Sequence, residues 1–221
     1  MLDDAQPRFH SALDDLDERF TVAGLRIIEA MPRLINGFLE ANDHVVAESQ
    51  RLMGAVHDEC QAIEDAGFRL LALQHPMGSD LRRLVALLRM CVDVDRSAAL
   101  LRHVCESLHM SDPRRLPAPL GDHVRELADR AAEVFRGGME AWRTKDALAV
   151  IELDLADEQV DRLQQLVLER AAQDDAAADD RIVLGLVARY LERIADHGVA
   201  IARDTAFAST GERVTLPSKA R

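Results

Sequence analysis

Five acidic residues in the C-terminal half have the types and spacing that could hold a metal ion. Asp154, Asp157 and Asp161 follow one another at steps of three and four residues, and Glu192 and Asp196 are four residues apart. In a helix each set shares one side, where like charges cost roughly 0.2–0.5 kcal/mol per pair. Carboxylates on facing helices bind Mg²⁺, Mn²⁺ or iron in helical bundles. We therefore predict a metal site; the alternative is an ordinary solvated acidic surface.

Catalytic motifs are missing from the sequence, and we predict that the chain is not an enzyme. A ferritin-like di-iron oxidase needs Glu-x-x-His on two helices, and only Glu106 to His109 fits. The sequence has no GxxxxGK[ST], GxGxxG, HExxH or GxSxG pattern. His57, His103 and His197 are scattered, as structural histidines usually are. The sequence has no basic, glycine-rich segment that would cradle a phosphate group.

Charge and cysteine usage indicate a cytoplasmic protein that does not bind nucleic acid. The formal net charge of -12 would repel a phosphate backbone over most of the surface. The acidic start of the chain lacks the features of a secretory signal, and no apolar stretch is long enough to span a bilayer. Cys60, Cys91 and Cys105 are odd in number and fall in helical patterns, so we predict small core residues in a reducing compartment.

Prolines divide the sequence into long windows with helical periodicity. In the first window the apolar residues follow alternating steps of four and three, the pattern of a helix with one buried side. These residues are Phe9, Leu13, Leu16, Phe20, Ala23, Ile27, Ala30 and Leu34. Pro32 is expected to kink this helix without ending it, because Leu34 and Phe38 continue the apolar stripe.

The remaining windows predict five further helices and an all-α fold. We expect these helices at residues 44–75, from the turn at 76–80 to about Met110, at 123–144, at 146–173 and at 180–209, with a loop at 174–180 before the last. The composition of Ser111 to Asp122 is typical of a linker. The sequence therefore predicts two tandem three-helix bundles with long, spectrin-repeat-like helices: residues 1–111, a linker at 112–122, and residues 123–221.

The two halves correspond at several positions, which indicates an internal repeat. The matching pairs are Asn42-Asp43 with Lys145-Asp146, Asp58 with Asp161, and Asp95-Arg96 with Glu192-Arg193. The spacing between matching residues becomes shorter toward the third helix of each half, and a longer loop in the first half accounts for this, since loops tolerate insertions.

At these residues the sequence resembles the PhoU family, cytoplasmic accessory proteins of bacterial phosphate transport and signalling. LALQHPMGSDLRRL, from Leu71 to Leu84, is similar to the family's turn between the second and third helices. YLERIADHGVAIA, from Tyr190, resembles the signature of the last helix, and DLADEQVDRL, from Asp154, resembles the acidic segment before it. The resemblance runs from about Phe9 to Glu212 and implies two three-helix bundles.

The resemblance also implies metal clusters held by paired E(D)xxxD motifs, one pair in each bundle. The second pair is present as Asp157 with Asp161 and Glu192 with Asp196. The first pair is broken, because Gly54 and Ala99 stand where carboxylates would complete Asp58 and Asp95, and Arg51 corresponds to Asp154. We therefore expect iron, zinc, manganese or magnesium on the C-terminal bundle, and an N-terminal bundle that is metal-free or nearly so.

The function implied by the resemblance is contact with other proteins. Such a protein would couple the ATPase subunit of a phosphate ABC transporter to a sensor histidine kinase, as a negative regulator of phosphate uptake and of the starvation response. It would reach the membrane only through these partners, and exposed seams between bundles allow a homodimer. The alternative is a metal-free helical scaffold that has drifted to another partner, which the broken first motif favours.

Overall fold

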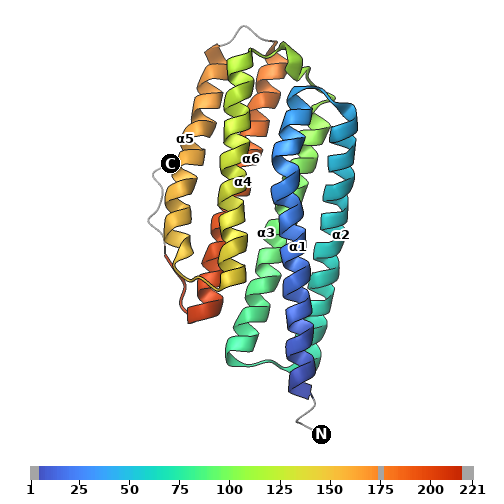
Figure 1. The fold of residues 1–221 in the computed structure, drawn as a ribbon, viewed down its shortest axis with the longest axis vertical. Helices are drawn as coiled ribbons and strands as arrows, with labels where there is room; N and C mark the ends of the chain where they lie inside the picture. Colours follow the sequence, from blue (N-terminus) through green and yellow to red (C-terminus); the bar gives the residue numbers. More distant parts are fainter. Residues whose placement is uncertain (1–4, 174–176, 216–221) are drawn as a thin grey trace.

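The computed structural model describes residues 5–173 and 177–215, with side chains from Arg8 onward. This part of the chain contains six long α-helices and one short 3₁₀ helix, and it has no strand (Figure 1). The elements are α1 (Ala5–Leu39), α2 (Asp43–Gln74), α3 (Gly78–Ser107), η1 (Pro113–Arg115), α4 (Ala118–Thr144), α5 (Ala149–Gln173) and α6 (Ala178–Thr210). The predicted all-α fold is confirmed.

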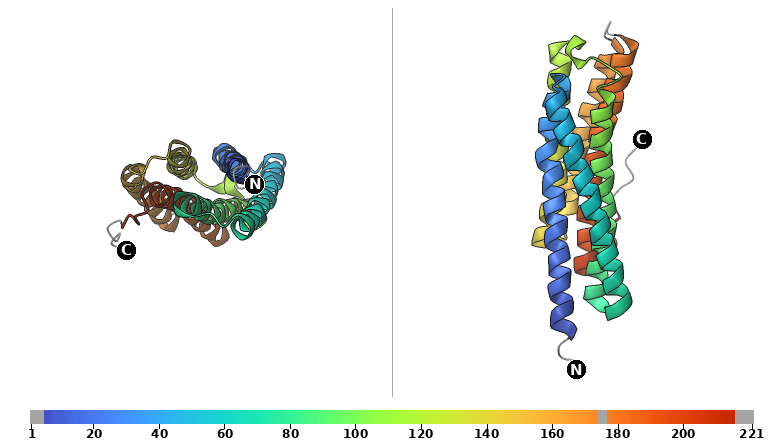
Figure 2. Two further views of the ribbon diagram at one scale, coloured as in Figure 1. Left: turned by 90° about the horizontal axis from the view of Figure 1, so that it is seen from below. Right: turned by 90° about the vertical axis from the view of Figure 1, so that its right-hand side faces the viewer.

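The helices form two bundles of three that lie side by side along their length. α1, α2 and α3 pack on one another, as do α4, α5 and α6. The bundles meet where α3 packs on α6 and α1 on α4, so one hydrophobic core runs through both. Seen from one end, α3 and α6 lie along one side of the molecule, opposite α1 and α4 (Figure 2). None of the described helices combines the length and the apolar character needed to cross a membrane.

α1 follows the predicted periodicity. All eight seam residues from Phe9 to Leu34 are buried, and Pro32 lies inside the helix, as expected. Proline removes one backbone hydrogen bond, but burial of Leu34 and Phe38 on the far side of it offsets that loss.

Several helix ends differ from the prediction because turn conformations were not recognised. α4 begins at Ala118, inside the segment predicted as a linker, because Pro117 and Pro119 fit a helix start. α5 begins only at Ala149, after Lys145 adopts a left-handed conformation with a φ of 57°. α3 ends at Ser107 and not near Met110. Of the predicted loop at 174–180, residues 174–176 lie outside the described residues, and α6 begins at Ala178.

Two glycines bring α4 and α6 into close contact. A Cβ atom at Gly138 would lie 2.2 Å from the carbonyl oxygen of Gly198, and one at Gly198 would lie 2.6 Å from Cα of Phe135. Across the other junction, Oγ of Ser97 on α3 lies 2.9 Å from Nδ1 of the buried His197 on α6. These contacts fix α6 between α4 and α3. The three cysteines are buried, as predicted.

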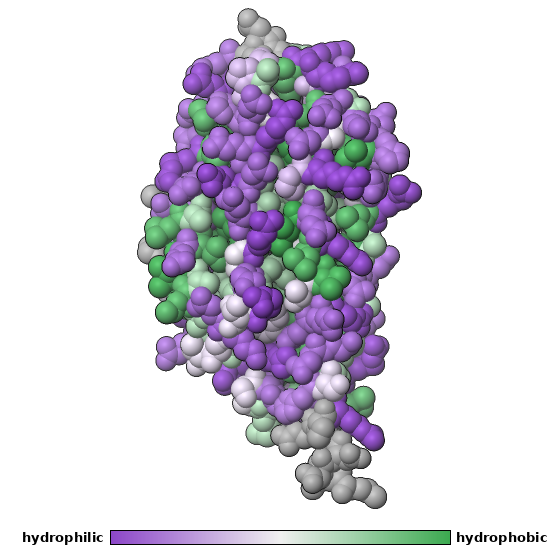
Figure 3. All heavy atoms as spheres, viewed as in Figure 1, coloured by the Kyte–Doolittle hydropathy of each residue, from purple (hydrophilic) through white to green (hydrophobic). Residues whose placement is uncertain are grey.

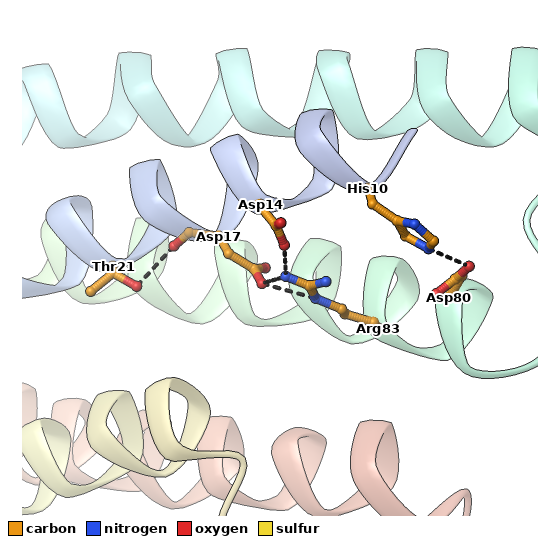
Figure 4. Close-up of polar contacts among 6 residues, drawn as sticks. All are labelled: His10, Asp14, Asp17, Thr21, Asp80 and Arg83. Carbon is orange, nitrogen blue, oxygen red and sulfur yellow. Dashed lines mark hydrogen bonds and ion pairs between the residues drawn. The ribbon is translucent and has the colours of Figure 1, made fainter. Parts of the chain in front are cut away.

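Polar contacts join α1 to α3 at one end of the first bundle (Figure 4). Nη2 of Arg83 donates to Asp14 at 2.6 Å, and its Nε donates to Asp17 at 2.9 Å. Nε2 of His10 lies 3.1 Å from Oδ2 of Asp80. Burial raises the pKa of Asp17, and the hydrogen bond from Arg83 opposes this shift. Arg83 therefore keeps a half-buried carboxylate in place between the two helices.

Candidate metal centre in the second bundle

The packing of α5 on α6 decides the position of the predicted carboxylates. On α5, Val160 and Val167 are buried and Leu153 is partly buried, so these residues form the apolar seam of this helix. Asp157 lies on the edge of this seam and is only 1% exposed. Buried aspartates are unusual unless they are paired or coordinate a metal, so this position is not that of an ordinary solvated acid.

Glu192 on α6 is also buried, with 7% of its surface exposed. An ordinary solvated acidic surface was the alternative to the predicted metal site, and the burial of Glu192 argues against that alternative at this position. Nη1 of Arg189 donates a hydrogen bond of 2.5 Å to Oε1 of Glu192. Oε2 of Glu192 is buried and has no hydrogen-bond partner among the described residues. A buried carboxylate oxygen without a donor is costly, and a cation would remove that cost.

Three of the predicted aspartates act electrostatically on Glu192, the fourth residue of this group. The pKa of Glu192 is raised to about 7, chiefly because the side chain is buried. The negative charges of Asp196, Asp161 and Asp157 also raise this pKa, whereas Arg189 lowers it. These effects place charges of Asp157 and Asp161 on α5 near Glu192 on α6, and the role of the two E(D)xxxD motifs as a metal site stays a prediction.

Asp154, the fifth predicted residue, is half-buried one turn before Asp157 on α5. It makes no hydrogen bond or ion pair that would connect it to the other four within residues 5–173 and 177–215. Its role as a metal ligand stays a prediction.

The side chains do not form a finished coordination shell. Among the described residues, no three His, Cys, Asp or Glu side chains are arranged to hold an ion together. The donor types suit a hard or borderline cation, and the partnerless Oε2 of Glu192 is available to one. Because no three of these groups are so arranged, binding by several of them would require other side-chain rotamers. Sequence reasoning missed Arg189, although its spacing of three residues from Glu192 is that of a helical ion pair.

The corresponding region of the first bundle contains fewer carboxylates. Oδ1 of Asp95 lies 2.7 Å from Nδ1 of His57, and Asp58 is exposed. A Cβ atom at Gly54 would meet no atom within 4 Å, so the position that corresponds to Asp157 is open space. Arg51 is exposed, and its Nε lies 3.4 Å from the carbonyl oxygen of Ala47. The absence of a metal in this bundle stays a prediction.

Comparisons with known proteins agree with this architecture. The family model "PhoU domain" matches twice, at residues 23–108 and 124–205, once in each bundle. The crystal structure of the phosphate transport system regulatory protein PhoU from Streptococcus pneumoniae has a TM-score of 0.84 at 20% identity, covering 94% of this chain and 100% of that one. PhoU from Pseudomonas aeruginosa gives a TM-score of 0.85 at 19% identity, covering 92% and 100%.

Curated relatives match over most of their own length. "Phosphate-specific transport system accessory protein PhoU homolog 1" of Mycobacterium leprae is 27% identical over 212 residues, 92% of this chain and 93% of that protein. A PhoU homolog of Caulobacter vibrioides is 30% identical over 180 residues, 77% of this chain and 74% of that protein. These names describe accessory proteins and no reaction, in agreement with the prediction that the chain is not an enzyme. With both of its bundles matched, this chain belongs to the PhoU family.

Proposed function

We propose that the chain is a cytoplasmic accessory protein of a phosphate ABC transporter. By contact with the transporter's ATPase subunit and with a sensor histidine kinase, it would keep phosphate uptake and the starvation response low when phosphate is plentiful. The observation that carries this proposal is the family match in both bundles, together with nearly full-length relatives named for phosphate-specific transport.

An exposed apolar surface supports a function by protein contact. Leu148, Ile151 and Leu155 follow one another at steps of three and four residues at the start of α5, and they are 72%, 55% and 59% exposed. Hydrophobic side chains gather over this part of α5, at the left of the space-filling view (Figure 3). Contiguous exposed apolar patches on soluble proteins typically mark a surface that binds another molecule.

The test is deletion of the gene followed by complementation. We expect phosphate-starvation genes to be expressed in phosphate-rich medium after deletion, and wild-type protein to restore their repression. A Leu148→Ser, Leu155→Ser variant should fold normally but restore repression poorly, whereas Phe68→Ser, at an exposed position on α2, should act as wild type. Unchanged expression of starvation genes after deletion would contradict the proposal.

We further propose that Asp157, Asp161, Glu192 and Asp196 hold iron, zinc, manganese or magnesium. A bound cation would neutralise this acidic cluster and favour the ionised form of Glu192, whose buried Oε2 lacks a partner. Metal analysis of protein purified without chelator tests this assignment. An Asp161→Ala, Asp196→Ala variant should lose the metal, and stoichiometric metal on that variant would disprove the assignment.

A metal-free scaffold with a different partner is the second candidate function. The observation in its favour is the hydrogen bond from the exposed Arg189 to the buried Glu192, because it gives this carboxylate a positively charged partner without a metal. This candidate predicts wild-type protein without metal and a gene remote from phosphate-transport genes. The first candidate predicts the opposite on both counts. Light scattering would measure the molar mass in solution and so test the expected homodimer, whichever of the two candidate functions is correct.

A further inference from the structure

A basic pocket lies between α3 and α6, at the junction of the two bundles. Arg89, Asp93 and Arg96 from α3 and Arg203 and Asp204 from α6 line this surface pocket, which has a volume of about 330 Å³. The two helices lie next to each other along one side of the molecule (Figure 2). No sequence segment predicted the pocket, because its residues come from helices about a hundred residues apart.

Positive charge exceeds negative charge in this pocket. Nη1 of Arg89 lies 3.0 Å from Oδ1 of Asp204, which is 6% exposed. Arg96 and Arg203 make no hydrogen bond and no ion pair within the described part of the chain. Burial raises the pKa of Asp93, and the positive charges of Arg96 and Arg203 oppose that shift. Burial also raises the pKa of Asp204, and the positive charges of Arg89, Arg203 and Arg213 oppose that shift.

Three guanidinium groups, those of Arg89, Arg96 and Arg203, therefore line the pocket together with two carboxylates, on a protein whose net charge is -12. Asp204 pairs with Arg89, so Asp93 is left as the carboxylate near Arg96 and Arg203, and a bound anion would further reduce the repulsion between these two arginines. Guanidinium forks match the oxygen spacing of phosphate, to which each can donate two hydrogen bonds.

We propose that the α3–α6 pocket binds a phosphate-type oxyanion, either free phosphate or the phosphate group of a small molecule. The choice of phosphate among oxyanions rests on the proposed function. The expectation that some anion binds rests only on the positive charge of the pocket. Asp93 does not exclude such a ligand. Burial, with the charge of Asp204, raises the pKa of Asp93 to about 6, so a nearby anion favours its neutral form.

The test is titration of chelator-treated, full-length protein with inorganic phosphate and with phosphoserine at constant ionic strength, observed by NMR at the arginine Nε–Hε groups. An Arg96→Ala, Arg203→Ala variant should bind at least about tenfold more weakly, because two charge-assisted contacts are lost. An Arg69→Ala, Arg136→Ala variant removes the same charge at exposed positions elsewhere and should bind as wild type. Asp93→Asn should strengthen binding, since it removes a negative charge.

The outcomes separate this proposal from its rivals. If neither phosphate nor phosphoserine binds the wild type, or if the control variant is weakened as much as the pocket variant, the proposal is wrong. Loss of binding in the Asp161→Ala, Asp196→Ala variant would overturn it too, by placing the anion at the acidic cluster. Retained binding there supports the pocket. This measurement is independent of the deletion phenotype, so failure of the regulatory function would be recognised separately.

Discussion

Replacing Glu192 by glutamine is expected to stabilise the metal-free protein above pH 7 and to weaken its metal binding. Glutamine keeps the volume of the side chain and an oxygen that can accept from Arg189. It removes the negative charge that burial and three neighbouring aspartates make unfavourable. Both effects would be explained by the proposed site, in which the charge of Glu192 destabilises the metal-free protein but is required to bind the metal.

The magnitude follows from the shift in the pKa of Glu192, from its usual 4.5 to about 7. Each pKa unit corresponds to about 1.4 kcal/mol, which limits the effect to roughly 3 kcal/mol. Solvent at the exposed Asp196 screens part of the repulsion, so we expect about 1–2 kcal/mol. Because the pKa is higher in the folded state, the folded state binds more protons between pH 4.5 and 7. The free energy of unfolding contributed by Glu192 therefore falls as pH rises through this window and stays low above it.

Urea unfolding in the presence of a chelator, at about pH 5 and about pH 8.5, measures the effect. The Glu192→Gln variant should exceed wild type in free energy of unfolding at the higher pH and differ little at the lower one. Glu158→Gln is the matched control on α5, because Glu158 is exposed and lies 3.6 Å from Arg162, a pair worth less than about 1 kcal/mol. A Glu192→Gln variant that is no more stable than wild type at high pH, or equally stabilised at both pH values, would refute the reasoning.

Other consequences can be tested in the same way. Gly198→Ala should destabilise the protein by about 2 kcal/mol or more, because the new Cβ would lie 2.6 Å from Cα of Phe135. Gly54→Ala should stabilise the protein by about 0.5–1 kcal/mol, because its Cβ would meet no atom within 4 Å and alanine favours a helix over glycine. Urea unfolding measures both changes, and equal effects of the two substitutions would contradict this prediction. Gly54→Asp with Ala99→Asp restores the carboxylates missing from the first bundle and should add bound metal by elemental analysis, whereas unchanged stoichiometry would show that other residues prevent binding there. Burial raises the pKa of Cys60 to about 12, so this thiol should react with a thiol reagent only on unfolding, and rapid labelling of folded protein would disprove its burial.

The sequence predicted the helices well because a helix is recorded locally, in the period of its apolar residues. Every residue of the first stripe, from Phe9 to Leu34, is buried as its spacing required. The errors fall at helix ends such as Ala118 and Ala149, where a few turn residues decide the boundary and periodicity gives little information.

The acidic residues of the candidate site were also identified from spacing, together with the helices that carry them. Their environment was not. The packing of α5 on α6 buries Asp157 and Glu192, which their spacing in the sequence does not reveal. The hydrogen bond from Arg189 to Glu192 was likewise visible only in the structure.

The sequence alone thus determined the all-α fold and the positions of the carboxylates along their helices, since both depend on residues close together in the chain. It also determined the repeat, because a repeat is visible as matching residue types in the two halves. The tertiary structure decided which helix sides meet. Burial of Glu192 and assembly of Arg89 with Arg203 depend on contacts between separate helices. Periodicity shows which residues share a side of a helix. It does not show which other helix that side packs against, because the packing of all six helices together decides the pairing.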